Sequence, residues 1–112
     1  MGAVAGAAGC DLEAVSARTP AVWRDLLGPE RFALAELIAR ESGDDAGVAA
    51  TRVWCAMECL KKSGALPGGP LVFAGARPDG WIELGAGQSK ILTYCAALRN
   101  LESPLAFAVM IE

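Results

Sequence analysis

The chain has 112 residues, of which 54% are hydrophobic and 21% charged, and its formal net charge is -3. This length suits one domain, and the apolar content excludes a wholly disordered chain. The sequence contains no His, which excludes Ser-His-Asp and Cys-His catalysis and every zinc site that uses an imidazole.

Residues 1–18 are rich in Ala and Gly and show no sustained apolar period, so we expect a flexible tail with a little helix around residues 12–17. Residues 19–112 are expected to form a single globular domain. The opening residues lack Lys and Arg, which argues against a signal peptide, and no apolar stretch approaches the roughly 20 residues of a membrane span. We therefore expect a cytoplasmic protein with reduced thiols, not bound to a membrane.

Three helices are predicted next. Thr19 and Pro20 are typical of a helix start, and Gly28-Pro29 separates this short helix from a second one over residues 29–41. A loop over residues 42–45 leads into a third helix over residues 45–63. The two longer helices would form an αα-hairpin.

The pattern then changes to short β-like runs at residues 71–74 and 81–84, joined by the turn sequence Pro78-Asp79-Gly80. We expect a β-hairpin here, followed by a fourth helix that begins at Ser89. Residues 105–111 are apolar throughout, which fits a strand covered on both faces. The predicted fold is α+β: N-terminal helices, a β-hairpin, a further helix and a C-terminal strand, with a small three-stranded sheet.

Cys55 and Cys59 lie four residues apart, on one face of the third helix, and Arg52 and Lys62 flank them at helical spacing. Nearby cations stabilise a thiolate, so this pair is the candidate for a reactive thiol or redox site. A free Cys is also often only a small buried hydrophobe, which is the ordinary explanation. The chain offers too few ligands for a metal site, and we expect neither a metal nor another cofactor.

The segment from Gly85 to Lys90 falls between a predicted strand and a predicted helix. Gly85 and Gly87 would let the backbone approach an anion, while Ser89 and Lys90 would stand at a helix N-terminus. The spacing is not that of a P-loop. An ordinary strand-to-helix loop capped by Ser89 is the simpler explanation of the segment, and the one we favour.

A winged-helix arrangement is an alternative for residues 32–84, with residues 50–66 as recognition helix and the hairpin as wing. Its phosphate contacts would be Arg52, Lys61, Lys62 and Arg77. The middle helix of that motif is missing, and the acidic chain makes nucleic acid a less expected partner. An αα-hairpin with solvated charges accounts for the same residues.

No acid–base pair or other catalytic constellation appears in the sequence. By elimination we expect a small non-enzymatic interaction module that binds another protein or a second copy of itself, such as an accessory subunit, a chaperone or an immunity-like partner. DNA binding is the first alternative, and a thiol-based or anion-binding activity is the second. An edge position for the C-terminal strand would allow strand pairing with a partner. The interface candidates are Trp81, Glu83, Phe107, Val109 and Ile111.

Overall fold

A computed structural model describes residues 7–15, 17–63, 70–97 and 102–111. These contain three helices and five strands. The helices and strands are β1 (Ala7–Ala14), α1 (Pro20–Leu27), α2 (Pro29–Ser42), α3 (Ala46–Ser63), β2 (Leu71–Ala76), β3 (Ile82–Ala86), β4 (Ser89–Ala96) and β5 (Leu105–Ile111).

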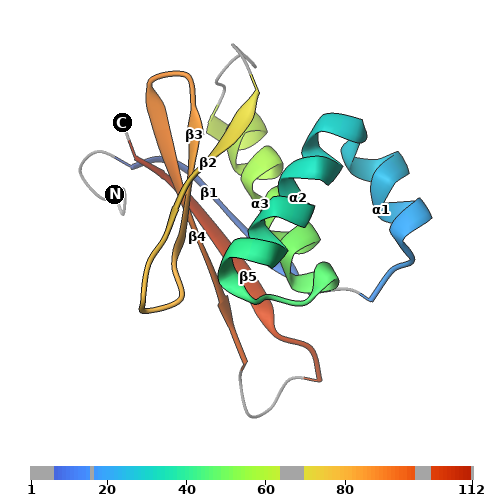
Figure 1. The fold of residues 1–112 in the computed structure, drawn as a ribbon. Coiled ribbons are helices and arrows are strands. Elements are labelled where there is room, and N and C mark those ends of the chain that lie inside the picture. Colours follow the sequence, from blue (N-terminus) through green and yellow to red (C-terminus); the bar gives the residue numbers. More distant parts are fainter. Residues whose placement is uncertain (1–6, 16, 64–69, 98–101, 112) are drawn as a thin grey trace.

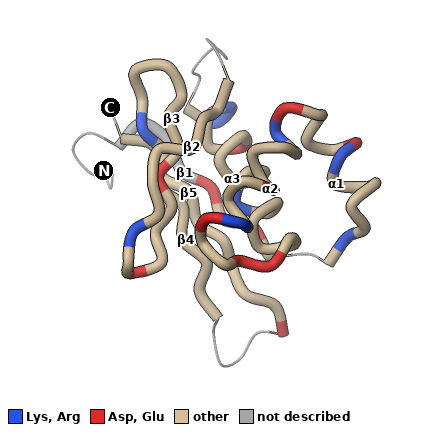
Figure 2. Tube along the Cα trace, viewed as in Figure 1, with Lys and Arg blue, Asp and Glu red and all other residues tan. Residues whose placement is uncertain are grey.

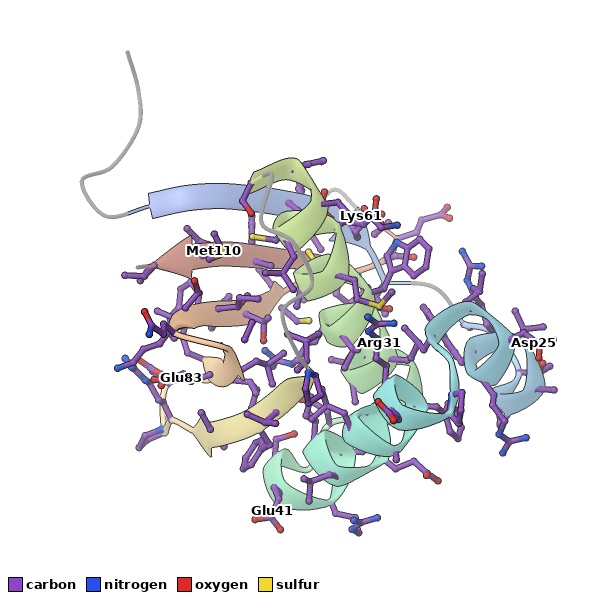
Figure 3. All side chains as sticks on the ribbon, turned by 90° about the horizontal axis from the view of Figure 1, so that it is seen from above. Asp25, Arg31, Glu41, Lys61, Glu83 and Met110 are labelled. Carbon is purple, nitrogen blue, oxygen red and sulfur yellow. The ribbon has the colours of Figure 1, made fainter. Side chains whose placement is uncertain are left out.

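The five strands form one antiparallel sheet in the order β1-β5-β4-β3-β2. Strands β2 to β5 form a meander, and β1 from the other end of the sequence pairs with β5. Figure 3 shows this order from β1 (blue) to β2 (yellow). β5 is therefore paired on both sides, so the expected strand pairing of a partner along β5 is excluded.

All three helices lie on one side of the sheet (Figure 1). α3 packs on β1, β5 and β4, while α2 packs on α3 and on β2. α1 contacts α2 and α3, away from the sheet. The other side of the sheet is covered by no helix or strand in the described part of the chain.

The three helices predicted between residues 19 and 63 are confirmed, and their ends follow from the sequence. The Thr19 side chain accepts a hydrogen bond from the Val22 backbone N–H at the start of α1. Gly43 ends α2 in the left-handed conformation, with φ of 81°. Asp45 caps α3, since its Oδ1 accepts a 2.8 Å hydrogen bond from the backbone N–H of Val48.

The α+β class and the β2–β3 hairpin are confirmed, but the three-stranded sheet is wrong because the sheet has five strands. One missed strand is β4, where a fourth helix was predicted. Ile91 and Cys95 are four residues apart, a spacing that places them on one side of a helix or a strand alike. The burial of Thr93, which lies between them, identifies a strand, because residues two apart share one face in a strand but not in a helix.

The turn before β4 also differs from the expected strand-to-helix loop. Ala86 and Ser89 face each other in the ladder, so Gly87 and Gln88 form a two-residue hairpin loop. Gly87 has φ of +62°, the conformation that such tight hairpin turns require at their first central residue. Ser89 is consequently the first residue of a strand and caps no helix.

The other missed strand is β1, which occupies residues 7–14 of the segment expected as a tail, and replaces the helical turn expected around residues 12–17. Its register pairs Leu12 with Phe107 and Asp11 with Ala108. Asp11 consequently faces the helices and is 5% exposed, whereas Leu12 faces away and is 54% exposed. This alternation is the reverse of an ordinary half-buried strand, which hides its apolar residues.

The core lies between the sheet and the helices. Small side chains on β5 and α3 let the helix approach the sheet closely, and Ile82, Leu84 and Ile91 fill the space beside them. Arg52 of α3 is buried there. Its guanidinium donates to Asp44 Oδ2 (2.7 Å) and to the backbone carbonyls of Thr93 (2.9 Å) and Gly80 (3.1 Å). This side chain thus connects α3 to β4 and to the β2–β3 turn.

Candidate functional site

The side of the sheet opposite the helices, here called the open face, carries large apolar side chains from five strands or their ends. Direct cross-strand partners share one face. Tyr94 pairs with Phe107 and Phe107 with Leu12, so these three side chains line up across β4, β5 and β1. The residues of the open face are Leu12, Val72, Trp81, Glu83, Lys90, Leu92, Tyr94, Phe107, Val109 and Ile111.

Trp81, which directly precedes β3, extends this row. Its ring packs against Tyr94 with a centroid distance of 5.0 Å and an interplanar angle of 38°. Gly80 lies against the same tyrosine, and a Cβ built there would stand 3.0 Å from Tyr94 Cε1. The row Trp81–Tyr94–Phe107–Leu12 is therefore a continuous band of three aromatic rings and a leucine.

The exposure of these side chains distinguishes the open face from the core. Leu12 is 54% exposed, Val72 51%, Phe107 37% and Ile111 38%. β5 was expected to be covered on both faces, which is wrong: Ala106, Ala108 and Met110 are buried, while the alternate residues face outward. A hollow of about 630 Å³ lies beside the row, and its lining residues are Asp11, Leu12, Lys62, Trp81, Tyr94, Phe107, Ala108 and Val109.

The few charges on this side pair with one another. Glu83 accepts a 2.9 Å hydrogen bond from Arg77, and its other carboxylate oxygen lies 4.0 Å from Lys90 Nζ. β5 carries no charged residue, and Figure 2 shows β4 and β5 without charge over most of their length. The open face is thus apolar at β1, β5 and β4, and bordered by paired charges at β3.

All five interface candidates from the sequence lie on this face. Trp81 and Glu83 come from β3 and its approach, while Phe107, Val109 and Ile111 come from β5. Sequence reasoning missed Leu12, Leu92 and Tyr94. For Leu92 and Tyr94 the signal was the alternation in β4, which the helix assignment concealed. The alternation in β1 would have placed Leu12 on the buried face, so no local signal identified it.

The candidate thiols Cys55 and Cys59 lie in the core, both with 0% exposure. Burial raises the pKa of Cys55 far above its ordinary value, and the charge of nearby Asp11 raises it further. The two cations expected to activate the thiols are engaged elsewhere: Arg52 with Asp44, and Lys62 with Asp11. These surroundings favour the protonated thiol, which is the weaker nucleophile.

The anion-binding candidates Gly85, Gly87, Ser89 and Lys90 lie along the β3–β4 hairpin. The helix N-terminus on which that prediction rests does not exist, because residues 89–96 form β4. Gly85 instead lets Val72 of β2 pack closely, since a Cβ built on Gly85 would stand 3.2 Å from Val72 Cγ2.

In the winged-helix alternative α3 would be the recognition helix, but it is not free to enter a DNA groove. α3 is packed between α2 and the sheet, and Arg52 is only 4% exposed. The other three expected phosphate contacts form ion pairs, Lys61 with Glu58, Lys62 with Asp11 and Arg77 with Glu83. No observation in the described residues favours a nucleic-acid interface.

The sequence analysis did not predict the charged cluster of Asp11, Glu13 and Lys62 between β1 and α3. Lys62 donates a hydrogen bond to the buried Asp11 Oδ1. Burial raises the pKa of Asp11, but the hydrogen bond and charge of Lys62 outweigh it, so that this pKa lies below its usual 3.8. Burial and the neighbouring Asp11 raise the pKa of Glu13. The cluster holds β1 against α3.

Comparisons with protein families, with curated proteins and with solved structures find no match for this chain. In the described part of the chain, no helix combines the length and the apolar character that crossing a membrane requires. Nor do the described Cys, Asp and Glu residues form a group of three or more that could hold a metal ion.

Proposed function

We propose that the protein is a non-enzymatic interaction module that docks through the open face of its sheet. The observation that carries the proposal is the row Trp81–Tyr94–Phe107–Leu12, whose members stay half-buried or exposed on a face that no described helix or strand covers. Large contiguous apolar patches are rare on monomeric proteins and commonly mark interfaces. Aromatic side chains are also frequent anchors of binding energy.

The charge pattern favours a partner surface that is itself apolar. The charges beside the open face are Glu83, Arg77 and Lys90, which leave an excess of one positive charge at its border and none within the row. A two-fold interface between identical copies requires a self-complementary surface. The uncharged row across β4, β5 and β1 meets that requirement, and two sheets can pack face to face about 10 Å apart. A second copy is therefore the partner to test first.

Light scattering after size exclusion, from low micromolar to near millimolar concentration, tests the proposal. We expect the mass of the wild-type protein to rise towards that of a dimer. Phe107→Lys should abolish the rise because it places a charge in the apolar row. Val22→Lys is the matched control, since Val22 is similarly exposed, at 43%, but lies on α1.

A wild-type chain that stays monomeric throughout moves the test to a different partner. The three proteins are then immobilised and exposed to the lysate of the source cells. A partner retained by the wild type and Val22→Lys but lost with Phe107→Lys supports docking through the open face. Monomers that retain nothing selectively, or that retain a partner equally with all three proteins, contradict the proposal.

A further inference from the structure

A second apolar surface lies among the three helices, on the side of the molecule away from the open face. It is a groove of about 430 Å³, here called the helical groove. The residues that line it are Arg18, Pro20, Trp23, Arg24, Phe32, Ala35, Glu36, Ala39, Arg40, Ala46 and Ala50. This volume falls in the range of small-molecule sites.

The floor of the groove is shaped by alanines. Ala35 and Ala39 stand four residues apart on α2, and Ala46 and Ala50 do the same on α3. Residues four apart lie on one side of a helix, so each pair forms a short row of small side chains. The space that larger side chains would fill is thereby left open, with apolar walls.

The rim of the groove is cationic. Arg18, Arg24 and Arg40 contribute three positive charges, and Glu36 is the one acidic residue of the lining, which leaves a local charge of +2 in a chain whose net charge is -3. Among the described residues, none of these arginines has a carboxylate oxygen within 4.0 Å. Their charges are thus available to an anionic ligand.

Two of these guanidinium groups are held over aromatic rings. Arg18 lies 5.2 Å from the ring centroid of Trp23, and Arg24 lies 4.8 Å from that of Phe32. Such cation–π contacts favour a position above the ring face. They place positive charge beside apolar side chains, which is where a ligand with an apolar body and an anionic head needs it.

Trp23 supplies a further observation. Its Nε1 is buried and has no hydrogen-bond acceptor among the described residues, although a buried indole N–H normally has one. An unpaired buried donor costs free energy, because it has lost its hydrogen bonds to water and gained none. Trp23 lines the groove, so a ligand acceptor that reached Nε1 there would form a hydrogen bond without breaking one.

From these observations we propose that the helical groove binds a small apolar carboxylate, of the chemical class of a medium-chain fatty acid. The apolar chain lies on the alanine floor between α2 and α3. The carboxylate accepts hydrogen bonds from the arginines at the rim. This inference is independent of the open face and of its docking function.

Decanoate, below its micelle concentration, is the probe, and the fluorescence of Trp23 is the signal. The titrated protein carries Trp54→Phe and Trp81→Phe, so that Trp23 is its only tryptophan. We expect a saturable shift of the emission with decanoate, and binding of decanol, which has the same chain without the charge, about tenfold weaker or more. Arg18→Gln, Arg24→Gln and Arg40→Gln should each weaken decanoate binding about two- to fivefold.

Ala39→Leu should abolish binding, because its larger side chain fills the floor of the groove. Ala33→Leu is the matched control, since Ala33 is exposed on the same helix and does not line the groove. Circular dichroism checks that both variants fold, and Arg31→Gln is the control for charge.

The proposal would be overturned by no saturable signal with decanoate, by equal affinity for decanol, or by unchanged binding by Ala39→Leu. A Trp23 signal that changes with protein concentration in the absence of decanoate would also overturn it, and would assign the groove to contact between copies. Binding of an acidic amphipathic peptide without binding of decanoate would overturn it in favour of a protein partner.

Discussion

The two faces of the sheet are built from the same strands, but one is buried under the helices and the other is exposed to solvent. On β5, Ala106, Ala108 and Met110 face the helices and are at most 1% exposed, while Phe107 and Ile111 on the other face are 37% and 38% exposed. On the covered face of β5, two of these three side chains are alanines, which admit a helix. The open face holds aromatic and branched side chains that nothing described covers.

An antiparallel sheet with one solvated face normally shows polar residues on that face. β1 reverses the rule, because Asp11 points to the helices and Leu12 points outward. Removing Asp11 from water requires compensation, which Lys62 provides. The difference between the faces teaches that the apolar character of the open face extends as far as β1, where it coincides with the burial of a carboxylate on the other face.

The largest expected effect on stability concerns Arg52, the buried cation beneath the covered face of the sheet. Arg52→Met removes hydrogen bonds to two carbonyls and leaves Asp44 without its cation, so we expect the free energy of unfolding to fall by about 3–5 kcal/mol. Arg77→Met removes the exposed ion pair with Glu83 and should cost about 1 kcal/mol or less. Urea unfolding of both variants measures the difference. Similar losses would contradict the structural role assigned to Arg52.

A second pair of variants compares the two faces directly on one strand. Met110→Ala leaves a cavity in the core and should lower the free energy of unfolding by about 2–5 kcal/mol. Phe107→Ala removes a side chain that solvent already reaches, so we expect a loss of about 1 kcal/mol in the monomer. Urea unfolding at low protein concentration tests this. A greater loss for Phe107→Ala would indicate that the open face is packed.

A smaller effect is expected from Asp11→Asn. Because the folded-state pKa of Asp11 is lowered from 3.8, its ionised form stabilises the fold above that value, and the contribution is lost as the pH falls through the lower folded-state pKa. The variant should be less stable than the wild type at neutral pH, and the two should converge in strong acid. A stability difference that does not change between pH 7 and strong acid would refute this assignment.

The smallest expected effect is a gain in stability, whereas the variants above lose stability. The pKa of Glu13 is raised above 4.5, so its ionised form destabilises the fold, and the penalty is relieved as the pH falls from above the folded-state pKa to below 4.5. Glu13→Gln should slightly stabilise the protein at neutral pH, with the gain vanishing in acid. Thermal unfolding as a function of pH measures it. Destabilisation at neutral pH would show that the carboxylate of Glu13 serves the fold in its ionised form.

The sequence alone determined the three helices and the β2–β3 hairpin, because their signals are local. Thr19, Gly43 and Asp45 satisfy or end the backbone hydrogen bonds of their own helices, whatever the rest of the chain does. The interface candidates on β5 were found for a similar reason, since an apolar run is visible without knowing what covers it.

Only the tertiary structure decided the identity of β1 and β4 and the location of the open face. The spacing of Ile91 and Cys95 fits a helix and a strand equally, and only pairing with β3 and β5 selects the strand. The alternation of Asp11 and Leu12 predicts the wrong face for both residues, because Lys62 is 51 positions away in the chain. Whether a segment forms a helix or a strand, and which of its faces is buried, depends here on contacts between segments distant in sequence. A local pattern of residues cannot predict such contacts.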